Sequence, residues 1–253
     1  MYGDIFNKPT SRLRPAPHEY ISPQLLTTTF LLIGKEKEYP MCCRYFVELS
    51  PELRPIVEAA RQSSLASRMV DVLGKRFVSE GEIRPTDMVA VIAPDRQGSR
   101  KAFPMVWGFS VPGIKGPLVN ARSESVRSRV SFRDSFKRRR CIVPASWYYE
   151  WEHHQVRGKI KTGEKYAIQP RGQEVTWLAG IYRIEKGHMD FPYPVFTILT
   201  REPSPDMKRI HDRMPVILPD RFIGDWLDTG CDSDRLGEIL RGSLTDMVTE
   251  VTG

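Results

Sequence analysis

Short apolar segments, separated by glycine and proline, recur along most of this chain and limit the folds open to it. Segments of this length that are rich in Val, Ile, Phe, Tyr and Trp are typical of β-strands. We expect strands at Cys42–Leu49, Met88–Ala93, Phe103–Phe109, Cys141–Trp151, Lys165–Gln169, Val175–Ile184 and Val195–Thr200. The sequence contains neither an internal repeat nor a heptad pattern.

Helical signals lie between and after these strands. Ser50-Pro51 has the composition of a helix start, and the apolar spacing over residues 65–73 predicts a helix that ends at Gly74. Further helices are expected at Ser204–Ile210, Asp220–Leu227 and Asp232–Leu240. Short strands with helices at the flanks predict an α+β fold, a single domain on a curved, mainly antiparallel, barrel-like β-sheet flanked by helices.

The first 41 residues differ from the rest in composition and in hydrophobic periodicity. They contain five prolines but no helical or strand period, so residues 1–41 are interpreted as a disordered leader or the product of a misassigned start. We expect the folded domain at 42–240 and a C-terminal tail at 241–253. The longest apolar run near the start, Phe30–Ile33, is too short for a membrane span or a signal peptide.

Composition places the chain among ordinary globular proteins. Its 253 residues are 40% hydrophobic and 27% charged, which permits a sizeable core. Four cysteines in a chain of this length do not make a disulfide framework, which favours a reducing setting. We therefore expect a cytoplasmic protein.

Positive charge is concentrated in one segment. Residues 115–140 hold nine Lys and Arg against two acids, so the difference of seven equals the whole net charge of +7. Such a concentration favours a polyanionic partner, nucleic acid first. The alternative is a solvated basic face.

The cysteines give little support for a metal site. Cys42 and Cys43 are adjacent, as are His153 and His154, whereas zinc ligands are usually two to four residues apart. No metal and no cofactor are therefore expected. Cys42 follows Met41, and removal of an initiating Met41 would leave an α-amine with a pKa of about 8 beside a thiol with a pKa of about 8.5. Spacing alone favours an ordinary strand cysteine.

Further candidate residues have structural alternatives as well. Glu150 lies between Tyr149 and Trp151, where desolvation would raise its pKa toward the range of an acid–base catalyst, although a strand-surface charge is the simpler interpretation. His211 precedes an apolar strand, and a lone histidine in such a place is more often structural than catalytic. Asn120 is compatible with a simple turn.

Five motifs in one order resemble the SRAP family of abasic-site processing proteins. They are Met41-Cys-Cys-Arg-Tyr-Phe46, Trp107-Gly108, Asn120-Ala-Arg-Ser-Glu124, Arg139 to Ala145 with Tyr149-Glu-Trp151, and His211-Asp-Arg-Met-Pro-Val216. The likeness runs from Cys42 to about Leu227. Two positions depart from the family pattern, because Cys43 and Trp147 stand where the family usually has glycine.

The resemblance implies binding of single-stranded DNA and covalent capture of abasic sites, which protects them during the DNA damage response. We accordingly expect a monomer that is associated with the nucleoid when bound to DNA. Cys42, as the first residue of the mature chain, would form a Schiff base through its amine and then a thiazolidine ring through its thiol. Asn120 would hold the amine or the sugar, Glu150 would shuttle protons, and His211 would assist ring opening and reversal. The DNA contacts implied are Arg44, Trp107, Arg122 and Arg213.

Two other functions remain open at this point. A self-cleaving cysteine peptidase would use Cys42 on the preceding peptide bond, with the leader as its substrate and no DNA crosslink. Such a cleavage, or an AP-lyase activity, is also compatible with a crosslinking protein. A non-enzymatic binder of single-stranded DNA explains the basic segment but gives no role to Cys42, Glu150 or His211.

Overall fold

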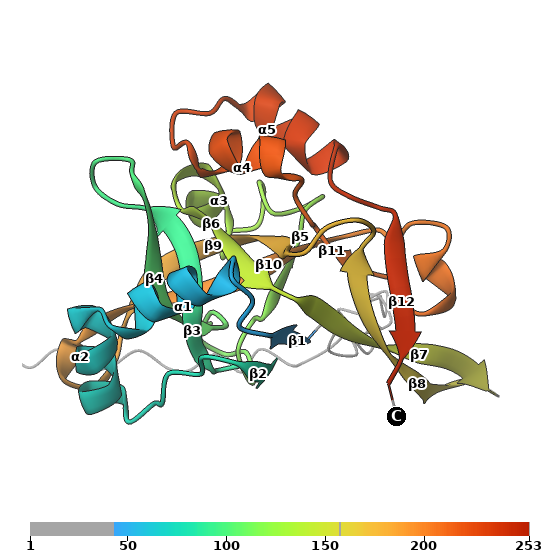
Figure 1. Ribbon diagram of the computed structural model, residues 1–253, viewed down its shortest axis with the longest axis horizontal. Helices are drawn as coiled ribbons and strands as arrows, with labels where there is room; N and C mark the ends of the chain where they lie inside the picture. Colours follow the sequence, from blue (N-terminus) through green and yellow to red (C-terminus); the bar gives the residue numbers. More distant parts are fainter. Residues whose placement is uncertain (1–42, 157, 253) are drawn as a thin grey trace, which may run out of the picture. The chain divides into compact units, whose positions relative to one another are not determined.

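The computed structural model describes residues 43–156 and 158–252, which form two β-sheets with helices packed against them (Figure 1). The strands are β1 (Arg44–Val47), β2 (Gly81–Ile83), β3 (Met88–Pro94), β4 (Arg100–Trp107), β5 (Asn120–Arg122), β6 (Arg140–Ala145), β7 (Trp147–Val156), β8 (Lys159–Pro170), β9 (Thr176–Lys186), β10 (Pro192–Arg201), β11 (Met214–Pro215) and β12 (Met247–Val251). The helices are α1 (Leu53–Arg61), α2 (Ser64–Leu73), α3 (Arg133–Arg138), α4 (Asp220–Leu227) and α5 (Ser233–Arg241), with 3₁₀ turns η1 (His188–Asp190) and η2 (Met207–Arg209). The expected α+β class is confirmed.

The larger sheet closes on itself. Its strand order is β11-β10-β4-β3-β6-β9, and β9 also pairs with β10, so the path from β10 through β4, β3, β6 and β9 returns to its first strand. The pairings are antiparallel except that β10 runs parallel to β4 and to β5. Closure leaves few unpaired edges and buries the inward side chains of every strand. The curved, mainly antiparallel, barrel-like sheet is confirmed.

The second sheet has the order β12-β8-β7-β1-β2 and is antiparallel throughout. Its outermost strand β12 lies within residues 241–253, and it pairs with β8 over five residues from Met247 to Val251. The last part of the chain therefore extends this sheet.

The strand expected at Lys165–Gln169 is longer, since β8 begins at Lys159, and two other expected elements are wrong. The single strand over Cys141–Trp151 is two strands, because the chain leaves the barrel at Ser146 and enters the second sheet. The Ser146 amide donates to the carbonyl oxygen of Phe46 at 2.8 Å, and the Ser146 hydroxyl accepts from the Glu48 amide at 2.9 Å. The helix expected at Ser204–Ile210 is only the 3₁₀ turn η2, in which the Met207 and Ile210 amides donate to carbonyl oxygens three residues back, at 3.0 and 2.9 Å.

The helices lie against the barrel (Figure 1). α1 packs on β3 and β4, while α4 packs on β6 and carries α5 on its far side. The expected ends of the helices over 65–73 and 220–227 are confirmed, and Gly74 ends α2 in the left-handed region with φ of 62°. Among the described residues, no helix combines the length and the apolar character that crossing a membrane requires.

Candidate functional site

Cys42 lies outside the described residues, so the site is built from Cys43, which immediately precedes β1. The register of β1 with β7 pairs Arg44 with Tyr149, and one residue further along each strand come Cys43 and Glu150. Burial raises the pKa of the Cys43 thiol, and the nearby Glu150 carboxylate raises it further. Glu150 is itself only 4% exposed. The start of β1 thus lies beside a buried carboxylate, the chemistry needed for proton transfer in a site that excludes water.

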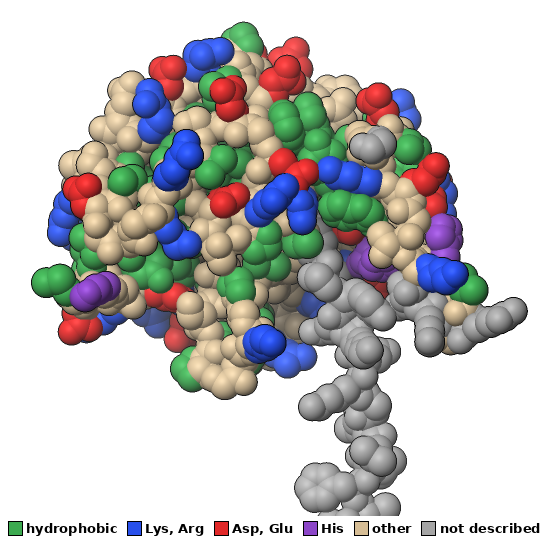
Figure 2. Space-filling model, turned by 90° about the horizontal axis from the view of Figure 1, so that it is seen from below, with side chains coloured by type: hydrophobic (Ala, Val, Ile, Leu, Met, Phe, Trp, Pro, Cys, Tyr) green, Lys and Arg blue, Asp and Glu red, His purple; other side chains and the backbone are tan. Residues whose placement is uncertain are grey.

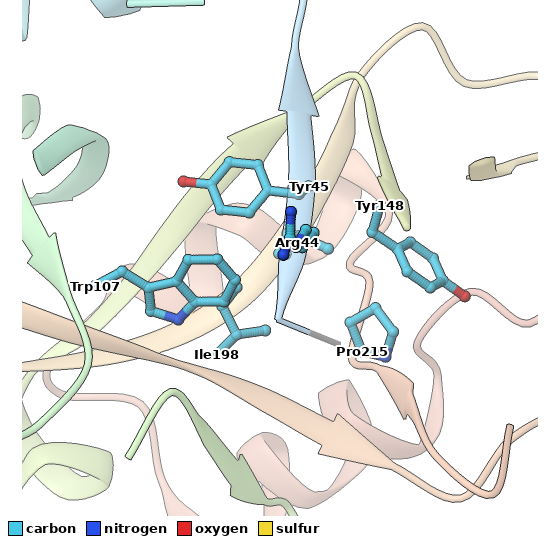
Figure 3. A pocket seen from close by; sticks show the side chains of 7 residues that line it. Arg44, Tyr45, Trp107, Tyr148, Ile198 and Pro215 are labelled. Carbon is cyan, nitrogen blue, oxygen red and sulfur yellow. The ribbon is translucent and has the colours of Figure 1, made fainter. Parts of the chain in front are cut away.

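A small pocket opens beside the first residues of β1 (Figure 3). In the figure, the first residues of β1 lie between Trp107 and Ile198 on one side and Tyr148 and Pro215 on the other. The pocket has a volume of about 10 Å³ and is lined by Arg44, Tyr45, Trp107, Tyr148, Leu178, Ile198 and Pro215. Strands from both sheets therefore converge on the residues that follow the predicted nucleophile.

Asn120 is brought to this region by β5. The parallel register of β5 with β10 pairs Asn120 with Ile198, which lines the pocket. The preceding residue, Val119, is fixed as well, because its carbonyl oxygen accepts a 2.9 Å hydrogen bond from Trp107 Nε1. The strand that carries the Asn120 side chain is therefore anchored to both β10 and β4.

His211 lies in the loop between η2 and β11, where its side chain is only 3% exposed. Its Nδ1 accepts a 3.1 Å hydrogen bond from the Arg213 amide and lies 2.8 Å from Asp212 Oδ1. Burial lowers the pKa of His211 against the opposing effect of the Asp212 carboxylate. The histidine is thus held in one orientation and is biased toward its neutral form.

A second histidine accompanies His211. The His153 ring lies 4.4 Å from the His211 ring, centroid to centroid, with 57° between their planes. Its position three residues after Glu150 places both on β7. In the sequence, His153 stands out only together with His154, as a pair spaced poorly for a metal. No signal in the sequence links it to His211, because 58 positions separate the two histidines.

The predicted DNA contacts divide into two groups. Arg122 is exposed on β5 and Arg44 is half-buried on β1. Trp107, in contrast, is 1% exposed, stacks on Phe196 and packs against Tyr45, so in this structure it is part of the core. The Arg213 guanidinium is committed to Glu124, through hydrogen bonds of 3.0 and 2.8 Å, and to the Thr200 carbonyl oxygen.

Cations and aromatic rings gather on the sheet next to Arg44. Glu82 on β2 forms ion pairs with Arg44, Arg84 and Lys165, so three positive charges surround one negative charge. Lys165 Nζ lies 3.7 Å from the centroid of the Tyr149 ring and 5.4 Å from that of Trp151. Burial would raise the pKa of Glu82, but hydrogen bonds from Lys165 and Arg44 lower it from 4.5 to about 2. The cluster keeps a net positive charge beside aromatic faces.

The basic segment is not one uniform surface. Arg140 is 1% exposed and donates hydrogen bonds to four carbonyl oxygens, those of Phe136, Lys137, Trp226 and Asp228, so it holds α3 and α4 on the barrel. Most other cations of the segment are exposed. On the face drawn in Figure 2, Lys and Arg side chains alternate with Asp and Glu rather than forming a patch of one sign.

The two departures from the family pattern have different surroundings. Trp147 stacks flat on Phe46, with 4.5 Å between ring centroids, and does not line the pocket. Cys43 lies within reach of the Glu150 charge. Within residues 43–156 and 158–252, no cluster of three or more His, Cys, Asp or Glu side chains has the arrangement of a metal site.

Comparisons with known proteins identify the family. The family described as SOS response associated peptidase (SRAP) matches residues 41–251. The abasic site processing protein YoaM of Bacillus subtilis is 32% identical over 163 residues, which cover 60% of this chain and 70% of that protein. The abasic site processing protein HMCES of Xenopus tropicalis is 29% identical over 126 residues, 44% of this chain and 38% of that protein.

Solved structures match the fold. A crystal structure of a Bacteroides thetaiotaomicron protein has a TM-score of 0.64 at 18% identity, covering 84% of this chain and 92% of that one. A phage-related protein of Bordetella bronchiseptica has a TM-score of 0.62 at 22% identity, covering 83% and 94%. At these identities the likeness concerns the fold alone.

Proposed function

Because the chain belongs to the SOS response associated peptidase (SRAP) family, we propose that it processes abasic sites by covalent capture in single-stranded DNA. The bacterial relatives YoaM and YoqW bear the name of abasic site processing proteins. The observation that carries the proposal is the position of the first described residues. Cys43 lies near buried Glu150, and the next residue, Arg44, lines a pocket built from both sheets.

The nucleophile is Cys42, the residue before Cys43. One peptide bond separates the α-carbons of neighbouring residues by about 3.8 Å, so a chain that begins at Cys42 carries its amine and thiol next to Cys43. The amine attacks the aldehyde carbon of the ring-opened abasic sugar, and loss of one water gives an imine. The thiol then adds to the imine carbon and its proton passes to the nitrogen, which closes a five-membered thiazolidine ring.

Buried polar residues serve the proton transfers of this sequence. Glu150 takes protons from the attacking amine and returns them to the departing hydroxyl, a role that suits a carboxylate 4% exposed beside the start of β1. His211 assists opening of the sugar ring and the reverse reaction. Asn120, carried by β5 next to pocket residue Ile198, orients the amine or the sugar.

The DNA backbone is bound by arginines at the edge of the site. Arg122 is exposed on β5, two residues from Asn120, and Arg44 follows Cys43 directly. The cations around Glu82 and the half-buried ring of Trp151 supply the combination of positive charge and aromatic surface that binds single strands. Trp107 and Arg213 act instead by packing and by positioning the loops.

A self-cleavage step is a second candidate function, and the family description as a peptidase favours it. Cleavage of the bond before Cys42 would release the amine that crosslinking needs, so the two activities can be successive. A leader cleavage without crosslinking gives a trimmed chain and no DNA adduct in an intact-mass measurement.

The test uses an oligonucleotide that carries one abasic site. Incubation with the chain beginning at Met41 should give a band of reduced mobility that survives heating in denaturant, while the undamaged oligonucleotide should give none. If both oligonucleotides are bound equally and neither complex survives heating, the proposal is wrong and a non-covalent binder remains.

A further inference from the structure

We propose that His153 is a positioning residue for His211, whose ring and loop it holds in place by direct ring contact and by a backbone hydrogen bond. The inference rests on the proposed function for the role of His211, but the contact itself belongs to the fold. His153 lies outside the five motifs that the chain shares with the SRAP family and outside every role derived above.

The geometry of the pair is that of a packed aromatic contact. A centroid distance of 4.4 Å and a 57° tilt bring the face of one ring against the edge of the other. The backbone reinforces the contact, since the His153 amide donates a 3.2 Å hydrogen bond to the carbonyl oxygen of Ile210, the residue before His211. β7 therefore holds both the ring and the loop that carries it.

One ring nitrogen of His211 is held by neighbouring groups, and the other is available for proton transfer. Nδ1 faces the Arg213 amide and Asp212. Nε2 is buried and has no hydrogen-bond partner among the described residues. The groups at Nδ1 hold the ring in place, and Nε2 is therefore the ring atom left to exchange a proton with a substrate oxygen.

The charges that act on His211 come from both sides of the ring. On its own loop these are the Asp212 carboxylate, 80% exposed, and the Arg213 guanidinium, which Glu124 pairs; on β7 it is His153. Burial lowers the pKa of His211, and His153 lowers it further. Burial also lowers the pKa of His153 against the effect of Asp212. Two imidazoles in contact disfavour a doubly protonated state.

His154 provides a matched control on the same strand. Consecutive strand residues point to opposite faces. The His154 Nε2 lies 2.9 Å from Glu152 Oε2 and its side chain is 54% exposed, so it is a histidine of β7 that does not stack on His211.

The experiment is a histidine titration of the whole chain by NMR, with His211→Ala used to assign the His211 signal. His153→Gln removes the charge and the ring cover, so the His211 midpoint should rise by on the order of one pH unit. His154→Gln should leave it unchanged. His153→Phe keeps the ring cover without the charge, and the His211 midpoint should lie between those of the parent chain and His153→Gln.

A His211 midpoint in His153→Gln equal to that in His154→Gln overturns the inference, whatever the crosslinking assays show. An upward shift supports it, provided that amide dispersion and thermal midpoint match those of the parent chain. If His153→Gln fails to fold, His153→Phe decides by the same criterion. In crosslinking assays, the low-pH fall of the rate should move to higher pH in His153→Gln, and failure of the parent chain to crosslink counts against the proposed function alone.

Discussion

Arg213 binds Glu124 through both terminal nitrogens of its guanidinium group, at 3.0 and 2.8 Å. This pair joins the loop that carries His211 to the turn that follows Asn120 and Arg122 on β5. Its guanidinium also donates to the Thr200 carbonyl oxygen of β10. Two segments that lie about ninety residues apart in the chain are thus held at one place on the barrel.

Replacing Glu124 by Gln should destabilise the fold, because it leaves the Arg213 side chain, 9% exposed, without its counter-charge. The expected loss in the free energy of unfolding is about 1–3 kcal/mol. Asp225→Asn removes the partner of Arg235 in a pair whose side chains are 39% and 45% exposed, and it should cost about 0–1 kcal/mol. Urea unfolding measures both, and equal losses would contradict the assigned role of Arg213.

The Glu82 cluster predicts a pH dependence of stability. The folded-state pKa of Glu82 is lowered from 4.5 to about 2, so its contribution is present above pH 4.5 and is lost as the pH falls toward 2. A difference of this size corresponds to about 3 kcal/mol. The stability difference between the parent chain and Glu82→Gln should therefore shrink between pH 5 and about pH 2. Exposed Glu250→Gln controls for loss of a charge, and a difference that is constant over this range would contradict the prediction.

Salt dependence tests the arginine contacts. If Arg122 meets a phosphate, affinity for undamaged single-stranded DNA should fall as salt rises, with a slope of about 0.7 per neutralised phosphate. Arg122→Ala should lower affinity and flatten that slope by somewhat under one unit. Exposed Arg61→Ala at the end of α1 should change neither. Fluorescence anisotropy at several salt concentrations gives the slopes. An unaltered slope in Arg122→Ala would show that Arg122 does not contact a phosphate and is only a solvated surface residue.

Glu150 and Glu152 lie two residues apart on β7 and permit a matched comparison. Glu150→Gln should slow adduct formation by about 10²–10⁴-fold, as expected for loss of a general acid–base group, with DNA affinity nearly unchanged. Glu152→Gln breaks hydrogen bonds to Tyr166 and His154 and should have a far smaller effect. Quenched time courses give the rates. Large, equal losses of DNA affinity in both variants would indicate structural roles.

Local patterns in the sequence predict local structure well. α4 has the predicted bounds, and Gly74 ends α2 because glycine adopts positive φ without strain. The break at Ser146 escapes prediction because the apolar run continues through it, although the chain changes sheets there. The parallel pairing of β10 with β4 and β5 also has no local signal, since it joins segments far apart in the chain.

The candidate site is likewise predictable only in part. Glu150, His211 and Asn120 can be proposed from their motifs, because each motif contains a side chain suited to a step of the chemistry. Contacts between distant segments cannot be predicted from motifs. The burial of Trp107 and the contact between the His153 and His211 rings are therefore seen only in the fold. An arginine in a motif is equally compatible with a phosphate contact and with an ion pair, which is why Arg213 was expected at the DNA.

The central claim is that the amine and thiol of Cys42 together capture the abasic site. With residues 1–41 attached, the Cys42 nitrogen belongs to an amide, whose lone pair is delocalised and does not attack an aldehyde. A chain beginning at Met41, from which methionine is removed, should therefore crosslink. Its Cys42→Ala variant should form no thiazolidine, while Cys43→Ala, which changes the neighbouring thiol, should retain most of the activity.

The most direct measurement compares that short chain with the full chain carrying Met41→Ile, each checked by intact mass and then incubated with an oligonucleotide bearing one abasic site. The short chain should give a heat-stable adduct whose mass equals protein plus oligonucleotide minus one water, with the modification mapped to Cys42. The uncleaved full chain should give none. A thiazolidine adduct formed by a full chain whose leader is demonstrably intact would contradict the mechanism.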